Sequence, residues 1–367
     1  MTESVSVSAD DIADALGRPR ATAEQRRVIE ASLAPALVVA GAGSGKTETM
    51  ANRVLWLLAN GQVKAGEILG LTFTRKAAGE LSARIRERIA QLHDAGLLAA
   101  DYDEFDPPIV ATYNSFANRI YRDNAILLGR ESDGPVLGEA SAWQLARRIV
   151  VGSTDDRLPG LEKSVDSVTK AVLALAHAMS ENLVDPADVA GFGTRFAAIV
   201  ELPPGGRGAY EGVATLARAV GALPVLVDLA VQFAETKARR GFVEYSDQVA
   251  LALTIVRDVP RVADELREQH RVVLLDEYQD TSVVQTWLLS ELFAARPVMA
   301  VGDPNQSIYG WRGASAANLD GFARQSVPAP TGILRSPPRG ETGTISSLWP
   351  TRSSSPSEMR QSGKFRM

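Results

Sequence analysis

A glycine-rich turn near the start of the chain is followed at once by a lysine and a threonine. Glycines let backbone N–H groups converge on phosphate oxygens, and the N-terminus of a following helix adds its positive dipole. In such a loop the lysine reaches the β and γ phosphates, and the threonine hydroxyl binds Mg²⁺. The segment predicts a site for ATP and Mg²⁺, and taken alone it indicates a nucleotide and nothing narrower. The residues expected around the nucleotide are Ala42, Gly43, Ser44, Gly45, Lys46 and Thr47.

Two adjacent carboxylates, Asp276 and Glu277, end an apolar run much later in the chain. We expect Asp276 to hold Mg²⁺ together with Thr47, and Glu277 to accept a proton from the water that attacks the γ-phosphate. An alternative is that both acids cap the helix that follows, a position that acids favour. Gln279 and Asp280 are open to both interpretations, as caps of that helix or as a relay of the nucleotide state.

Short apolar runs, alternating at first with helix-like stretches, must position these residues. Runs that are apolar on both faces are typical of buried parallel strands, and this alternation predicts a doubly wound α/β domain. The gap between the third and fourth runs is too long for one crossover, and Ala-rich segments of helical periodicity fill it. The five runs are Ala36–Ala40, Ile68–Phe73, Ile109–Thr112, Val272–Leu275 and Pro297–Val301.

The change of pattern along the chain suggests domain boundaries. Beyond residue 325, Pro, Ser, Arg and Gly dominate and the apolar periodicity ends, which predicts disorder and suggests a frameshifted or truncated reading frame. The expected divisions are a flexible N-terminus (1–18), an ATP-binding domain in two parts (19–118 and 241–325), an inserted helical domain (119–240) and a disordered tail (326–367).

Composition sets wider limits. The chain has 367 residues, 45% of them hydrophobic, a net charge of −5 and no cysteine. Disulfides and thiolate metal sites are thereby excluded, and the three histidines are too scattered to suggest a zinc site, so we expect them at the surface or at boundaries. The N-terminus lacks the features of a signal peptide, and we expect no apolar run long enough to span a bilayer, so we expect a cytoplasmic protein without a membrane partner.

Four further segments, with the two above, closely resemble superfamily 1 DNA helicases of the UvrD/Rep type, in the same order and at similar separations. The resemblance covers residues 20–325. It implies a RecA-like P-loop NTPase domain, an ATP-dependent 3′→5′ helicase or translocase, and single-stranded or duplex-junction DNA as partner in repair or recombination. The four segments are TAEQ (22–25), LTFTRKAAGEL (71–81), ATYNSF (111–116) and VGDPNQSIYGWRGA (301–314).

The resemblance also assigns roles to single residues. Gln25 matches a glutamine that reads the adenine edge, although Thr22 and Gln25 also form a capping box. Gln306 matches a sensor of the γ-phosphate, although Gln after Asp-Pro-Asn also suits a turn. An alternative to DNA contact for the basic residues at and after Arg75 is a solvated helix face. This alternative suits Arg84, Arg86 and Arg88 best. The residues expected to contact DNA are Phe73, Thr74, Arg75, Thr112, Asn114, Tyr309, Trp311 and Arg312.

Several features depart from the family pattern. Glu48 stands where many members have a basic residue, and Asn114 stands at a common histidine position. These variants point weakly toward RecB-like helicase–nuclease subunits, with a second subunit as an additional partner. Members bind ATP between two RecA-like domains, and this chain stops short of the second, whose arginines typically raise the rate by about 10³ to 10⁵. We therefore expect slow turnover, and the alternatives are a nucleotide-dependent DNA-binding module without motor activity or an unrelated P-loop NTPase.

Overall fold

The computed structural model describes residues 6–98, 102–201, 211–307, 322 and 333–336. In these residues a fully parallel sheet has the strand order β3-β2-β4-β5-β1-β6. Each of the five runs expected to form strands does so, in agreement with the predicted α/β class. The strands are β1 (Ala36–Ala40), β2 (Ile68–Thr72), β3 (Ile109–Thr112), β4 (Val272–Leu275), β5 (Val298–Gly302) and β6 (Ile333–Ser336).

The sheet is buried on both faces, which explains its continuous apolar runs. In β4, Val272 and Leu274 pack with the helices of one face, and Val273 and Leu275 with those of the other. One face is covered by α1 (Ala9–Ala15), α2 (Ala23–Ile29), α3 (Lys46–Ala59) and α4 (Arg75–Asp94). The other is covered by α5 (Tyr113–Asn124), α11 (Tyr245–Asp258), α12 (Pro260–Gln269) and α13 (Val283–Phe293).

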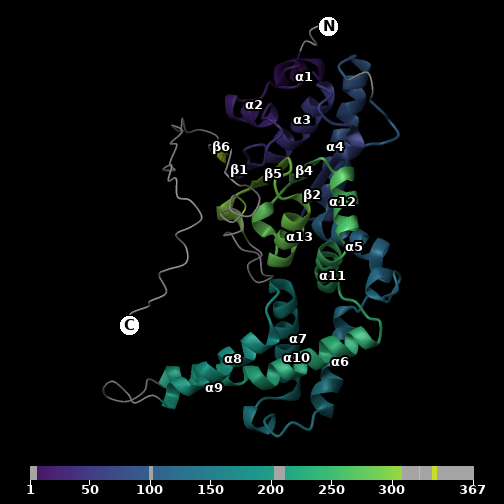
Figure 1. Cartoon of the computed structure of the whole chain (residues 1–367). Helices are drawn as coiled ribbons and strands as arrows, with labels where there is room; N and C mark the ends of the chain where they lie inside the picture. Colours follow the sequence, from purple (N-terminus) through teal and green to yellow (C-terminus); the bar gives the residue numbers. More distant parts are fainter. Residues whose placement is uncertain (1–5, 99–101, 202–210, 308–321, 323–332, 337–367) are drawn as a thin grey trace, which may run out of the picture.

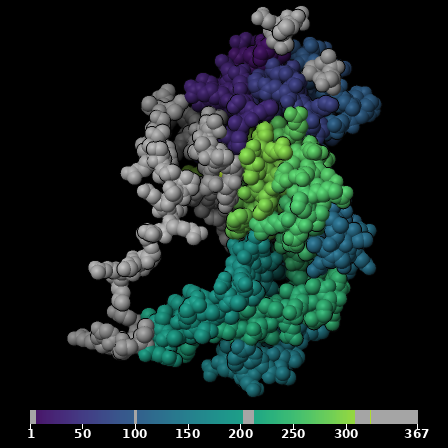
Figure 2. All heavy atoms as spheres, in the orientation of Figure 1, coloured from purple at the N-terminus to yellow at the C-terminus, as the bar shows by residue number. Residues whose placement is uncertain are grey.

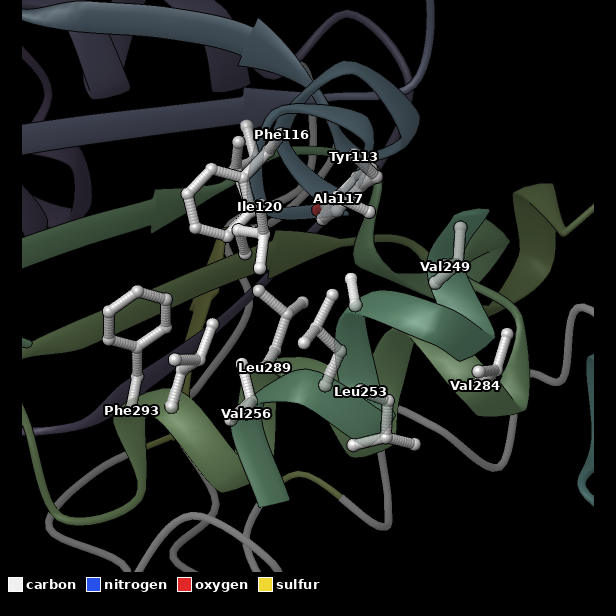
Figure 3. Close-up of a cluster of buried hydrophobic side chains, with 14 of the residues drawn as sticks. Tyr113, Phe116, Ala117, Ile120, Val249, Leu253, Val256, Val284, Leu289 and Phe293 are labelled. Carbon is white, nitrogen blue, oxygen red and sulfur yellow. The ribbon is translucent and has the colours of Figure 1, made fainter. Parts of the chain in front are cut away.

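Figure 3 shows the second of these cores, where α5, α11 and α13 meet. Phe116 and Ile120 of α5 point toward Leu253 of α11 and Phe293 of α13. Since α5 packs against the sheet domain, the helical insertion begins after it and not at residue 119 as expected. His270, which precedes β4, is also fully buried, although we expected a surface or boundary position.

The insertion has a core of its own, to which α6, α7 and α10 contribute. It lies at one end of the sheet domain, and its α8–α9 end projects from the rest of the chain (Figures 1 and 2). Its core extends from Leu137 to Phe242, whereas the expected bounds of the helical insertion are 119 and 240. Its helices are α6 (Glu139–Gly152), α7 (Val165–Asn182), α8 (Pro186–Ala197), α9 (Glu211–Gly221) and α10 (Leu223–Arg239).

The two ends of the chain differ from expectation in their described parts. The segment 1–18, expected to be flexible, contains α1, because Ser8 and Asp11 form a capping box and Ile12 packs into the core. Within the tail, residues 333–336 form β6 beside β1, although we expected no strand there. The short apolar pair Ile333 and Leu334 gives little signal by itself, and pairing with β1 decides its conformation. The rest of the predicted tail, 326–332 and 337–367, lies outside the described residues.

One helical run, Gly212–Arg239, is long and apolar enough to cross a membrane by length and composition alone. The expectation that no run has this length is therefore wrong. The run comprises most of α9 and all of α10, and the two helices are separate elements joined at Ala222. Val227 and Phe233 of α10 are buried in the core of the insertion.

Candidate functional site

The glycine-rich turn joins β1 to α3 as expected for a phosphate-binding loop. Gly43 and Gly45 have φ angles of 71° and 81°, which L side chains rarely adopt. Gly45 is the N-cap of α3, and its carbonyl accepts the first helical hydrogen bond, from Thr49 N–H at 2.9 Å. Lys46 and Thr47 therefore occupy the first turn of α3, where free N–H groups and the helix dipole favour an anion.

Lys46 and Ser44 have the features of ligand-binding groups. Lys46 Nζ and Ser44 Oγ are buried, and among the described residues neither makes a hydrogen bond. Lys46 Nζ lies 3.5 Å from Glu277 Oε2, at ion-pair distance. A buried ammonium without a hydrogen bond is costly unless something else neutralises it. Together with the free N–H groups of α3, this arrangement fits a phosphate group.

Asp276 comes at the carboxyl end of β4, and its backbone continues the sheet by donating to Leu71 O at 2.8 Å. Its side chain is buried, and burial followed by the charge of Glu277 raises its pKa to about 6. A carboxylate in such a place favours a cation. Asp276 with the hydroxyl of Thr47 is thus a suitable donor set for Mg²⁺.

Glu277 has a φ of 49°, a conformation unusual for a residue other than glycine. Strain of this kind costs on the order of 1–3 kcal/mol and persists only where the surroundings enforce it. Its carboxylate accepts a hydrogen bond from Gln279 Nε2 at 2.8 Å and makes no capping hydrogen bond. The capping alternative for this acid pair is wrong, because Ser282 caps α13.

Gln279 connects the ends of two neighbouring strands. It is almost fully buried, and its Oε1 accepts the backbone N–H of Asp303, at the end of β5, at 3.0 Å. Asp303 in turn accepts a hydrogen bond from Gln306 Nε2, in the turn that follows β5. A continuous chain of contacts therefore joins Lys46, Glu277, Gln279, Asp303 and Gln306. This geometry favours the relay interpretation of Gln279 over the cap.

Gln25 contacts the loop itself. Its side chain completes the predicted capping box with Thr22, and its Nε2 donates to Ser44 O at 2.9 Å. Arg53 of α3 contacts the C-terminal end of α2, the helix that contains Gln25, by donating to Ile29 O at 2.7 Å. Gln25 therefore contacts the candidate phosphate-binding loop, and contact with adenine remains a prediction.

Five of the residues expected to contact DNA lie at or just after the carboxyl ends of β2 and β3, which are adjacent strands. Thr74 and Arg75 are exposed and Phe73 is half-buried. Thr112 is buried, and its hydroxyl caps α5 by accepting Ser115 N–H at 3.0 Å. Asn114 is exposed, and its Oδ1 accepts Gln285 Nε2 at 2.9 Å. The remaining predicted contacts, Tyr309, Trp311 and Arg312, lie outside the described residues.

Glu48 and Arg88 form a pair that the sequence did not reveal. Arg88 is almost fully buried, and its guanidinium donates to Glu48 at 2.8 Å and to Asn52 at 2.9 Å. The prediction that Arg88 is on a solvated face is wrong, because α4 turns this position toward α3. Glu48, an unusual residue after such a loop, thus has a structural partner.

Two residues near the site were missed as functional candidates. Asp303 belongs to the segment 301–314, and its place at the carboxyl end of a strand was the available signal. Tyr113 donates its hydroxyl to Asp276 O at 2.8 Å, a contact over 163 residues of sequence. Nothing in a single sequence indicates such a pair.

The sequence model of the UvrD/REP helicase N-terminal domain family matches residues 21–326. DNA helicase II of Haemophilus influenzae is 26% identical over 306 residues, which are 82% of this chain and 36% of that protein. ATP-dependent DNA helicase UvrD1 of Mycobacterium leprae is 30% identical over 330 residues, 85% of this chain and 36% of the relative. ATP-dependent DNA helicase UvrD2 of Mycobacterium bovis is 28% identical over 310 residues, 82% and 39% respectively. The chain thus spans little more than a third of each relative.

Proposed function

The chain belongs to the UvrD/REP helicase N-terminal domain family, and from this premise we propose that it is the ATP-binding part of a DNA helicase or translocase. The relatives named above are described as DNA helicases, two of them as ATP-dependent. The polarity 3′→5′, a role in repair or recombination and a cytoplasmic location belong to the proposal through the resemblance of its motifs. No relative named above is described as a nuclease, so a helicase–nuclease partner has no support.

The observation that carries the proposal is the buried Lys46 Nζ, without a hydrogen bond among the described residues and 3.5 Å from Glu277. In the proposed site Lys46 binds the β and γ phosphates, and Thr47 and Asp276 hold Mg²⁺. The metal supplies charge neutralisation at the phosphates. Glu277 then accepts a proton from the attacking water, and its hydrogen bond to Gln279 fixes its direction. Gln25 binds the adenine edge.

For Gln306 we propose a sensor of the γ-phosphate. Its contact with Asp303 links it through Gln279 to Glu277. A γ-phosphate that binds the amide of Gln306 in place of Asp303 therefore alters one end of this hydrogen-bond network. The turn Pro304–Gln306 gives this side chain its place after β5.

The proposed track for single-stranded DNA crosses the carboxyl ends of β2 and β3. Exposed Thr74, Arg75 and Asn114 offer hydrogen bonds and charge to backbone phosphates, and Phe73 offers a ring for base stacking. We also propose that Thr112 contacts the DNA backbone, because it is the N-cap of α5, whose first turn contains Asn114. Tyr309, Trp311 and Arg312 stay in the proposal by resemblance alone.

A nucleotide-dependent DNA-binding module without motor activity is the second candidate. A module of this kind binds ATP and single strands and separates no duplex.

Binding and strand separation measured side by side test the two candidates. The purified chain should bind fluorescent oligo(dT), and Arg75→Ala should weaken binding by about threefold to tenfold, since one charged phosphate contact is lost. Arg86→Ala removes an exposed arginine farther along α4 and should have less effect. DNA-stimulated ATP hydrolysis with strand separation excludes the module, and binding without either supports it. A chain that binds neither an ATP analogue nor single strands refutes both.

A further inference from the structure

The hydroxyl of Tyr113 joins a DNA-facing turn to the acid that faces the nucleotide. Tyr113 is the first residue of α5, is 3% exposed, and donates to the backbone carbonyl of Asp276 at 2.8 Å. Its ring is fixed in the core shown in Figure 3. Burial raises the pKa of the phenol well above 10, so the hydroxyl keeps the proton that it donates. Thr112 and Asn114, both proposed to contact DNA, flank it in sequence.

Asp276 is held by hydrogen bonds from both sides of its backbone. Its N–H donates to Leu71 O at 2.8 Å, in the strand that leads to Phe73, and its carbonyl accepts the hydroxyl of Tyr113. Strand β2 and the residue that follows β3 therefore both contact this one residue. The first contact is part of the sheet, while the second depends on a single side-chain oxygen and can be removed without altering the sheet.

A second contact runs in parallel. Gln285 Nε2 donates to Asn114 Oδ1 at 2.9 Å, and Gln285 Oε1 accepts Ser282 N–H at 2.9 Å in the capping box of α13. The first turn of α5 is thus bonded to β4 at its end and to the helix that follows it. Movement of this turn moves both attachment points.

The carbonyl that Tyr113 contacts belongs to the peptide between Asp276 and Glu277. Glu277 has a φ of 49°, so this peptide already stands in an unfavourable orientation that its surroundings maintain. Rotation of the peptide changes the direction of the Glu277 carboxylate, which lies 3.5 Å from Lys46 Nζ. The hydroxyl of Tyr113 therefore acts on the position of the general base through the backbone.

We propose that Tyr113 is a positioning residue that couples DNA bound at Thr112 and Asn114 to the nucleotide site at Asp276 and Glu277. The inference rests on the proposed function, since it needs both ligands. DNA that binds to the first turn of α5 displaces the hydroxyl of Tyr113. The peptide between Asp276 and Glu277 moves with this hydroxyl, and the affinity for nucleotide changes. By linkage, nucleotide changes the affinity for DNA by the same factor.

The test measures this factor in the full chain. A fluorescent, non-hydrolysable ATP analogue is titrated with Mg²⁺, with and without saturating oligo(dT), and the ratio of the two Kd values is the coupling factor. Coupling between two sites is typically about 5-fold to 150-fold. Tyr113→Phe should bring the factor about threefold to tenfold closer to one, since it removes one buried hydrogen bond. Affinity for each ligand alone should change less. Tyr121→Phe, the same change at another buried position of α5, is the matched control and should leave the factor unchanged.

Gln285→Met breaks the parallel contact and tests the same inference if Tyr113→Phe does not fold. It too should bring the factor closer to one. An unchanged factor in the folded variants, or a wild-type factor of one with both ligands bound, overturns the role of Tyr113 and leaves the proposed function standing. Failure of the wild-type chain to bind either ligand overturns both.

Discussion

Gln279→Leu removes the amide that joins the ends of β4 and β5. The amide accepts Asp303 N–H at 3.0 Å and donates to Glu277 at 2.8 Å, and Gln279 itself is 1% exposed. Loss of the acceptor leaves a buried N–H without a partner, which costs about 1–3 kcal/mol. Glu277 has a side-chain exposure of 35%, so water compensates much of the lost donor. We expect the free energy of unfolding to fall by about 2 kcal/mol.

Urea unfolding followed by circular dichroism measures this loss. Gln144→Leu is the control, because Gln144 is exposed on α6 and a surface substitution typically changes stability by under about 0.5 kcal/mol. Gln279→Leu should also weaken binding of the Mg²⁺–ATP analogue, since Glu277 loses its orientation. If the stability of Gln279→Leu lies within about 0.5 kcal/mol of the wild type, the relay interpretation of Gln279 is refuted.

Two further predictions concern the stability of the fold. Arg88→Met should lower the free energy of unfolding by about 2–3 kcal/mol, because Glu48 and Asn52 lose the buried guanidinium that donates to them. Arg84→Met, at a 36% exposed side chain, should lower it by under about 1 kcal/mol. Equal effects in urea titrations would contradict the buried pair. Burial, aided by the charge of Arg119, lowers the pKa of His270 to about 4, below its unfolded value near 6.5. The unfolded state therefore takes up the proton first as pH falls, and stability present above pH 6.5 should decline toward pH 4 by at most about 3 kcal/mol. His270→Gln should flatten this decline in urea titrations at several pH values, whereas His93→Gln, at an exposed side chain, should not.

The sequence predicted the sheet well because each strand is apolar on both faces. Leu274 and Leu275 face opposite sides and are both buried, a pattern typical of an internal strand of a covered sheet. The phosphate loop was equally predictable, since Gly43 and Gly45 have the positive φ angles that glycine permits. Local signals of this kind depend on neighbours in sequence.

What could not be predicted depends on contacts between distant segments. Arg88 carries the same charge as its exposed neighbours on α4, and only the packing of α3 against α4 shows that it is buried. β6 is a short strand whose conformation depends on pairing with β1. α1 packs against core residues that come later in the sequence. The contact of Tyr113 with Asp276 has the same origin, because two elements meet only once the sheet has formed.

Titration of the chain with a fluorescent ATP analogue, with Mg²⁺ and with chelator, tests the central claim most directly. Lys46 Nζ is buried without a hydrogen bond among the described residues, so we expect saturable, Mg²⁺-dependent binding that Lys46→Ala weakens by at least about tenfold. The melting temperature of the variant, measured without ligand, controls for folding. Absence of binding by the wild-type chain, or equal affinity in a folded Lys46→Ala variant, would contradict the assignment of this loop as the nucleotide site.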